Sequence, residues 1–132
     1  MRILTDHIVE GDSANHQVSI KVLDEPGAGG ACHEYSISWP GFISDLEGNK
    51  SPAERYCSIG FQNGPIKEFG VNGITQEVLL AIVIDRLRSF QAGPFACREN
   101  EAAMVLCQDA LDLLQQRTRT RIARGVEGTH QA

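Results

Sequence analysis

The sequence predicts an α+β fold in which an N-terminal antiparallel β-sheet precedes a C-terminal antiparallel two-helix hairpin. Short segments with apolar residues at every second position recur through residues 1–70. After Gly73 the apolar spacing changes to the three-and-four pattern of helices, and a Gly-Pro pair divides that region in two. We therefore expect a β-region over residues 1–72 and a helical hairpin with a short tail over residues 73–132, together forming one compact unit.

Three segments of the front half alternate in the manner of half-buried strands, at residues 17–23, 34–39 and 56–62. Asn63-Gly64 follows the third segment and is typical of a hairpin turn, which predicts a returning strand over residues 66–69. A further strand is indicated near residues 3–9. The Pro- and Gly-rich stretch 24–30 predicts a loop, and so does the longer segment 40–55, which contains Gly, Asn, Ser and Pro.

The first predicted helix covers about residues 76–90, with Thr75 as its N-cap. Gly93-Pro94 ends it, Gly93 as a left-handed cap and Pro94 as the residue that stops the helix. Its side chains are apolar nearly all round, so it must be covered on several sides. A partner helix with a sheet face would cover it, and so would a second subunit.

The second predicted helix runs from about Arg98 to Arg124 and ends at Gly125. Acidic residues lie in its first turn and arginines in its last turns, as the helix dipole favours. At the usual rise its length is roughly 40 Å, against roughly 22 Å for the first helix. The arginine-rich end therefore extends beyond the partner helix, and we expect the residues after Gly125 to form a loose tail.

Charge narrows the range of ligands. The chain has 132 residues and a net charge of -5, which disfavours a general binder of nucleic acid or anionic membranes. Residues 1–116 hold eight Lys and Arg against sixteen Asp and Glu, whereas residues 117–132 hold four arginines and one glutamate. A basic end on an acidic chain favours a small anionic ligand. No signal peptide or long apolar run is present, so we expect a soluble, cytoplasmic protein.

Catalytic and metal-binding patterns are lacking. The four cysteines form no CxxC pair, and four scattered thiols are typical of buried residues in a reducing compartment. His33-Glu34 begins like a metalloprotease motif, but no second histidine follows at the required spacing. We therefore expect no metal, no cofactor and no catalytic residues, and interpret the chain as a binding protein.

Two stretches, Gly70–Asn100 and Arg117–Gln131, together with the sequence FQNGPIKE before them, carry a family resemblance. They resemble the Thoeris anti-defence protein 1 family of phages and, more distantly, the helical hairpin of the anti-CBASS protein 2 family. The first family pairs an N-terminal β-region with a C-terminal helical hairpin, which is the order predicted here. The second consists essentially of the hairpin alone.

The resemblance implies a sponge for immune signals that acts in the cytoplasm of the infected bacterium. Members of both families are homo-oligomers, commonly hexamers, here expected to be built from dimers. They hold glycocyclic ADP-ribose (gcADPR) or cyclic di- and trinucleotides without cleaving them, so the defence effector is not activated. Two alternatives stay open: an enzyme that degrades cyclic nucleotides, and a small phage structural or nucleic-acid-binding protein that uses the arginine-rich end.

The last turns of the second helix offer candidate phosphate ligands. Arg117, Arg121 and Arg124 share one face by their spacing, whereas Arg119 does not. Guanidinium groups in register can grip a pyrophosphate through paired, charge-assisted hydrogen bonds. The alternative is a solvated helix end that the dipole stabilises. The resemblance places Arg117 and Arg121 at phosphate-contacting positions.

The bend of the hairpin supplies the other candidates. The Phe90 ring can stack on adenine, and the Asn100 amide can read a base edge or a ribose hydroxyl. The alternatives are turn packing for Phe90 and solvation for Asn100; the resemblance places both at ligand-contacting positions. Phe95 is an alternative stacking residue. Arg98, at the helix N-terminus, suits phosphate, or forms an ion pair with Glu101.

Spacing along the helix predicts how these residues come together. Asn100 and Arg117 lie roughly 25 Å apart at helical rise, too far for one small cyclic nucleotide to contact both in a single chain. The bend of one subunit must then meet the arginine end of another. We therefore expect composite sites at a two-fold interface between antiparallel hairpins.

Overall fold

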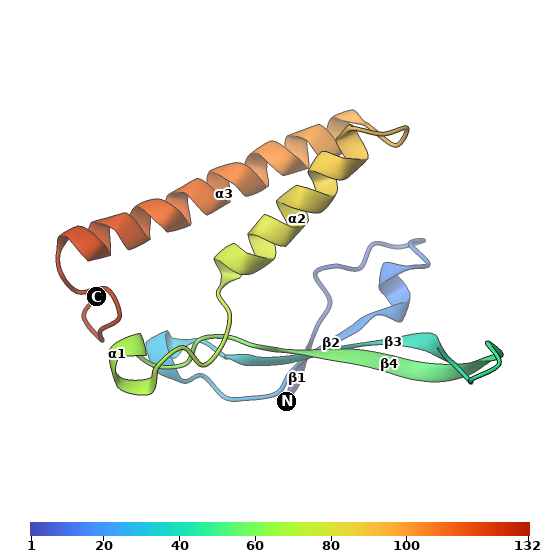
Figure 1. The fold of residues 1–132 in the computed structure, drawn as a ribbon, viewed down its shortest axis with the longest axis horizontal. Helices are drawn as coiled ribbons and strands as arrows, with labels where there is room; N and C mark the ends of the chain where they lie inside the picture. The colour runs from blue at the N-terminus through green and yellow to red at the C-terminus, as the bar shows by residue number, and fades with distance from the viewer. The chain divides into compact units, whose positions relative to one another are not determined.

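The computed structural model describes all residues, 1–132, and divides into two compact units, Met1–Gly64 and Pro65–Ala132. The first unit contains a four-stranded antiparallel sheet, and the second contains three helices, of which the two long ones form a hairpin (Figure 1). The predicted fold class is confirmed. The second unit includes a short helix, Ile66–Phe69, that precedes the helical hairpin. No helix is both long and apolar enough to span a membrane.

The sheet has the strand order β1-β2-β3-β4, and every neighbouring pair is antiparallel. The strands cover Arg2–Leu4 (β1), Ser19–Val22 (β2), Glu34–Ser44 (β3) and Lys50–Gly60 (β4). The register pairs Ile20 with Ile37 and Val22 with Tyr35, so the alternation seen in the sequence places apolar residues on one face. Val22 is completely buried, and the Tyr35 and Phe61 rings meet edge to face at 5.5 Å.

The loop predicted over residues 40–55 is wrong: this segment is the distal half of the long β3–β4 hairpin. Pro40 and Pro52 are tolerated because beyond Ser38 each of these strands pairs only with the other, so each has one edge that needs no N–H donor. Gly41 is required for packing, since a Cβ there would collide with the Arg55 side chain.

A tight turn closes the β3–β4 hairpin. The Asp45 carboxylate accepts hydrogen bonds from the backbone N–H groups of Glu47 (2.9 Å) and Asn49 (2.9 Å), while Gly48 adopts a left-handed conformation at φ 84°. Residue types that are common in loops thus form a tight turn here, with a defined hydrogen-bond pattern.

The loop between β2 and β3 is held by Asp24. Its carboxylate accepts hydrogen bonds from the backbone N–H groups of His33 (2.8 Å) and Glu34 (3.0 Å). These two bonds, that of His33 first, hold the pKa of Asp24 below its usual value because they favour the charged form. The carboxylate therefore sets where β3 begins.

The strand predicted over residues 66–69 is also wrong, because these residues form the short helix α1, Ile66–Phe69. Pro65 sits at its N-cap, where its carbonyl accepts from the N–H groups of Glu68 and Phe69. Gly70 ends it with φ 68°, a conformation that glycine adopts without strain. Proline before the segment and glycine after it are the local signals for one helical turn rather than a strand.

The predicted helical hairpin is confirmed, with α2 at Gln76–Gln91 and α3 at Arg98–Ala123 packed against each other. With 26 residues against 16, α3 continues past the length that α2 can cover (Figure 1). Thr75 occupies the N-cap of α2, but its side chain makes no capping bond. The expected left-handed cap at Gly93 is wrong: its φ is not positive, and α2 ends in a right-handed turn at Ala92.

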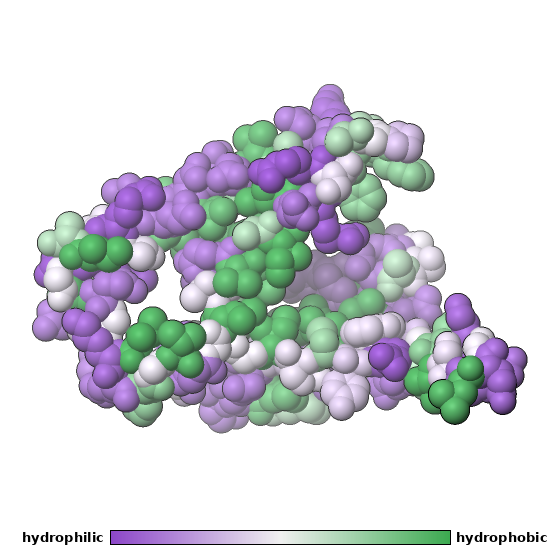
Figure 2. Space-filling model, in the orientation of Figure 1, coloured by the Kyte–Doolittle hydropathy of each residue, from purple (hydrophilic) through white to green (hydrophobic).

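Few apolar side chains are buried within one chain. Only Val22, Ile84 and Val126 form the buried hydrophobic set. Ile82 on α2 is 54% exposed, and Leu106 and Leu113 on α3 are 68% and 72% exposed. Apolar residues accordingly reach the surface in both units on the face shown in Figure 2. So small a core leaves much of the apolar surface in contact with solvent.

Candidate functional site

The bend between α2 and α3 is built by Gln91. Its side-chain oxygen accepts from the backbone N–H of Cys97 (2.9 Å), and its side-chain nitrogen donates to the carboxylate of Glu101 (3.3 Å). Cys97 in turn caps α3, where its Sγ accepts from the N–H of Asn100 at 3.4 Å. No pattern in the sequence indicated these roles, since glutamine is common in helices and cysteine is not among the usual N-caps.

The candidate residues at the bend are accessible. The Phe90 side chain is 40% exposed, and the Arg86 guanidinium lies 5.4 Å from its ring centroid, within the range of a cation–π contact. Asn100 is half-buried and Phe95 is 74% exposed. Arg98 is exposed and does not form the ion pair with Glu101, which bonds Gln91 instead. An aromatic ring, an amide and a guanidinium are thus available at this end of the hairpin.

The other end of α3 carries exposed cations. The Arg117 and Arg124 side chains are exposed and have no hydrogen-bond or ion-pair partner. Arg119 is exposed as well, but its guanidinium donates to the side chain of Gln116 at 3.3 Å. The two unpartnered guanidiniums share the helix face that the sequence spacing indicated, and they are available to an anion.

Arg121 differs from its neighbours because it is buried, with 9% of its surface exposed. Its Nε donates to the carboxylate of Glu127 at 3.1 Å, and its terminal nitrogens donate to three backbone carbonyls of the tail. These carbonyls belong to Val126 (3.0 Å), Thr129 (3.3 Å) and Gln131 (2.5 Å). Four of its five N–H donors are therefore committed within the chain.

The tail that was expected to be loose is folded. Gly125 has φ 72°, and its N–H donates to the carbonyl of Ile122 (3.0 Å), while the N–H of Val126 donates to the carbonyl of Arg121 (3.0 Å). This is the Schellman arrangement that ends many helices. Val126 is buried at 7% exposure. The prediction of a loose tail was wrong because composition does not show that a buried arginine donates hydrogen bonds to the carbonyls of the segment that follows it.

The folded tail is also attached to α1. The Gly128 carbonyl accepts from the backbone N–H of Lys67 at 3.2 Å, and the His130 ring lies 2.6 Å from the carboxylate of Glu68. We call residues 126–131 with α1 and the Arg121 side chain the C-terminal clasp. It joins the end of α3 to a segment that precedes α2 in the chain, which nothing in the sequence indicated.

The candidate residues form two groups at opposite ends of α3. Phe90, Arg98 and Asn100 lie at the bend, and Arg117, Arg121 and Arg124 lie at the far end. A hollow of about 470 Å³ on α3 is lined by Arg119, with Asp109, Asp112, Leu113 and Gln116, and by none of these candidates. Within one chain no small ligand reaches both groups, since about 25 Å of helix separates Asn100 from Arg117.

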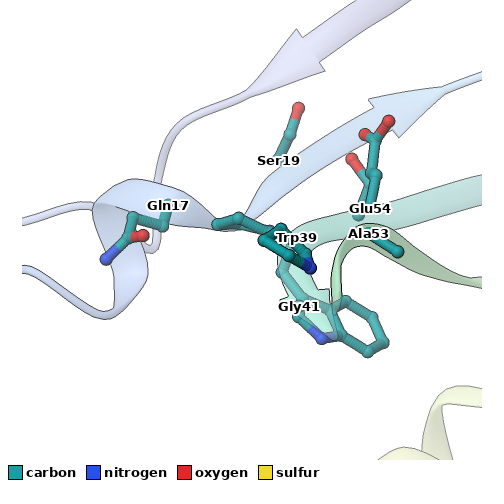
Figure 3. Close-up of a pocket in the computed structure, with 9 residues that line it drawn as sticks. Gln17, Ser19, Trp39, Gly41, Ala53 and Glu54 are labelled. Carbon is teal, nitrogen blue, oxygen red and sulfur yellow. The ribbon is translucent and has the colours of Figure 1, made fainter. Parts of the chain in front are cut away.

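The sheet unit has a hollow of its own. It measures about 460 Å³ and lies over the paired strands around Trp39 and Glu54. Figure 3 shows the side chains of Ser19 and Glu54 on the same side of the sheet, as the strand register requires. None of the predicted ligand-binding residues lines it, and no three His, Cys, Asp or Glu side chains are placed to hold a metal ion.

Comparison with known proteins identifies the same hairpin. A family model described as "Acb2/Tad1, hairpin domain" matches residues 53–119, half of the chain. The chain is also 46% identical over 82 residues to a protein named "Thoeris anti-defense 1" of Bacillus phage SBSphiJ7. That match covers 62% of this chain and 58% of the relative, so it spans little more than half of the relative's length. The region matched by the family model includes Phe90, Arg98, Asn100 and Arg117 and ends before Arg121 and Arg124.

Proposed function

Because the chain belongs to the Acb2/Tad1 hairpin family and is homologous to Thoeris anti-defense 1, we propose that it sequesters cyclic nucleotide immune signals. In this function the protein binds gcADPR or a cyclic di- or trinucleotide and holds it without cleaving it. Binding lowers the concentration of free signal, so the bacterial defence effector stays inactive. The protein would act in the cytoplasm of the infected cell, which is where such signals are made.

One observation carries the proposal: the guanidinium of Arg117 is exposed and unpartnered on the part of α3 that α2 cannot cover. Arg124 offers a second free guanidinium at the same end. Fixed cations without internal partners favour phosphate oxygens through charge-assisted hydrogen bonds. With a net charge of -5 over the whole chain, this local excess of arginine selects a compact anion over a long polyanion such as DNA.

The bend supplies contacts for the base and ribose. A purine can stack on the exposed ring of Phe90, and base–aromatic stacking contributes about 1–3 kcal/mol. The Asn100 amide can donate to and accept from a base edge or a ribose hydroxyl. Arg98, which forms no internal ion pair, is the remaining cation at this end. The proposed phosphate and base contacts thus come from opposite ends of the helical hairpin.

We propose that two copies complete each site. The bend of one subunit meets the arginine end of its partner, and an antiparallel pair of hairpins contains two such sites by symmetry. The same association covers apolar residues that one chain leaves exposed, including Ile82 and Leu106. A hexamer of three such dimers is the assembly proposed for the protein.

Calorimetry with ligand recovery tests the function. The purified protein is titrated with gcADPR, cyclic di-AMP, cyclic GMP-AMP and a cyclic trinucleotide, with duplex DNA as the control. We expect saturable binding of at least one cyclic nucleotide, no stoichiometric binding of DNA, and intact ligand after the complex is heat-denatured. Recovery of a linear product would show a degrading enzyme, and binding of DNA alone, weakening steeply with salt, would show a nucleic-acid-binding protein.

A further inference from the structure

The two candidate ligand residues at the bend belong to different helices, Phe90 to α2 and Asn100 to α3. We propose that Gln91, the last residue of α2, is the positioning residue that holds these two in register. Its side chain fixes the first turn of α3 against the last turn of α2, and it needs no contact with the ligand to do so. This role rests on the proposed binding of cyclic nucleotides.

The segment that joins the two helices is not held in place by packing. Residues 92–97 are all exposed, and none of them belongs to the buried hydrophobic set. The segment also contains Gly93, and glycine leaves the backbone freer than any other residue. The backbone at the start of α3 is therefore fixed by hydrogen bonds rather than by burial of the connecting segment.

Two hydrogen bonds lead from Gln91 to Asn100. The Gln91 side-chain oxygen accepts from the backbone N–H of Cys97 at 2.9 Å, and the Sγ of Cys97 accepts from the backbone N–H of Asn100 at 3.4 Å. Phe90 precedes Gln91 directly in α2. The aromatic ring and the amide of the proposed site are thus joined through one side chain and one helix cap, although the chain between them runs through the exposed segment.

The same glutamine makes a second attachment to α3. Its side-chain nitrogen donates to the carboxylate of Glu101 at 3.3 Å, so one amide uses both its acceptor and a donor at the start of the helix. Cys97 and Glu101 lie one helical turn apart and on the same side of α3. Two attachment points at this spacing restrict both the position and the rotation of the first turn.

The ring at the end of α2 is restrained as well. The Arg86 guanidinium lies over the Phe90 ring, 5.4 Å from its centroid. A base that stacks on Phe90 and also bonds the Asn100 amide needs both side chains at a fixed separation, because hydrogen bonds weaken steeply with distance and angle. A shift of the first turn of α3 would remove the amide contact while leaving the stacking surface intact.

Four variants test this role by calorimetry with gcADPR and the other cyclic nucleotides titrated above. Gln91→Leu keeps the side-chain size but loses both hydrogen bonds, and Gln91→Glu places a carboxylate beside that of Glu101. Adding Glu101→Gln to Gln91→Glu exchanges the two side chains, which restores the hydrogen bond and the wild-type net charge. Adding Glu99→Gln instead restores the net charge alone, since Glu99 is exposed and forms no hydrogen bond with Gln91.

We expect Gln91→Leu and Gln91→Glu to weaken binding of the ligand that the wild type binds by about tenfold, which equals about 1.4 kcal/mol. The exchanged pair should bind within about threefold of the wild type, because a hydrogen bond of the same kind is restored. Gln91→Glu with Glu99→Gln should stay about tenfold weaker than the wild type.

Amide exchange of residues 97–101, measured by mass spectrometry, follows the bend without any ligand. It should rise in Gln91→Leu and Gln91→Glu and return to the wild-type rate in the exchanged pair. Gln108→Glu is the matched control, because it breaks an amide-to-carboxylate hydrogen bond of 3.0 Å to Asp112 farther along α3. It should leave both affinity and this exchange at wild-type values.

Wild-type affinity of Gln91→Leu, or unchanged amide exchange in that variant, would overturn the positioning role. Equal recovery in the two double variants would overturn it too, since net charge would then be responsible. If Gln91→Leu does not fold, the exchanged pair decides, and a loss of affinity as large as that of Gln91→Glu alone would contradict the role. Failure of the wild type to bind any cyclic nucleotide would instead refute the proposed function, so the two failures are distinguishable.

Discussion

Arg121 Nε lies 3.1 Å from Glu127 Oε2, so an arginine inside the last turns of α3 is paired with a carboxylate that follows the end of that helix. The Arg121–Glu127 ion pair closes a loop around Gly125, which has a left-handed conformation, and the guanidinium also donates hydrogen bonds to three tail carbonyls. Arg117, one helical turn earlier, has no such partner. Two arginines that look equivalent in the sequence are therefore physically different, and each leads to its own prediction.

Arg121→Ala should destabilise the protein. The substitution leaves the Val126, Thr129 and Gln131 carbonyls without their donor, and we expect the free energy of unfolding to fall by about 2–4 kcal/mol. Urea unfolding followed by circular dichroism measures the change. Arg117→Ala is the control, with an expected change within about 0.5 kcal/mol. Equal stability of the two variants would contradict the structural role of Arg121.

Arg117→Ala should weaken ligand binding without affecting stability. A hydrogen bond from a charged donor contributes about 1.5–3 kcal/mol, so affinity for the bound cyclic nucleotide should fall by about ten- to a hundredfold. Calorimetry measures the loss. Arg119→Ala removes the same charge from a different face of the same helix and should change affinity little. If both variants lost affinity equally, net charge rather than a positioned guanidinium would be responsible.

Phe90→Ala should reduce affinity through loss of base stacking. The expected decrease is about 1–3 kcal/mol, because the exposed face of the ring is the part a base would cover. Phe95→Ala removes an even more exposed ring near the same bend and serves as the control. Calorimetric titration of both variants shows which ring stacks on the base. A loss of affinity confined to Phe95→Ala would assign the stacking role to Phe95.

A site shared between two subunits predicts complementation. Phe90→Ala and Arg117→Ala alter the parts of a site that come from different subunits, so joint refolding of the two weakly binding variants should restore some intact sites. In a mixed dimer one site carries both substitutions and the other carries neither. Calorimetry of the mixture should therefore recover binding with wild-type affinity at a reduced stoichiometry, and light scattering should show an oligomer. A pure monomer that still binds ligand would exclude the composite site.

Acid should weaken the sheet unit through Asp24. Hydrogen bonds from the backbone, above all from His33, hold its pKa below the usual value, so the carboxylate stabilises the folded state. This contribution is fully present above the unfolded-state pKa of about 3.9 and is lost as the pH falls through the lower folded-state pKa. The difference in unfolding free energy between wild type and Asp24→Asn should accordingly be largest near neutral pH and shrink in strong acid. Asp6→Asn, at an exposed position without hydrogen bonds, should show little difference at either pH.

Much of the fold could be predicted because it depends on local periodicity. Alternation over residues 17–23 and 34–39 and the helical spacing after Gly73 correspond to β2, β3, α2 and α3 as observed. These patterns are reliable because one face of each element must exclude water. The secondary-structure predictions were wrong where they did not take account of which segments pair in the sheet. Residues 40–55 resemble a loop until the partner strand is known. Residues 66–69 were predicted as a strand from the turn signal Asn63-Gly64, but Pro65 and Gly70 enclose one helical turn there.

The candidate site, like the fold, could be predicted from the sequence only in part. Spacing alone placed Arg117, Arg121 and Arg124 on one helix face, because helix geometry determines which residues share a face. Phe90 and Asn100 were selected as ligand contacts by the family resemblance. The amino-acid sequence thus determined the two-helix hairpin and the concentration of arginines at its far end. Only the tertiary structure decided that Arg121 is buried beneath a folded tail while Arg117 stays free. The reason is that the acceptors of Arg121 are mostly backbone carbonyls, which every residue carries and which no sequence pattern distinguishes until the chain has folded.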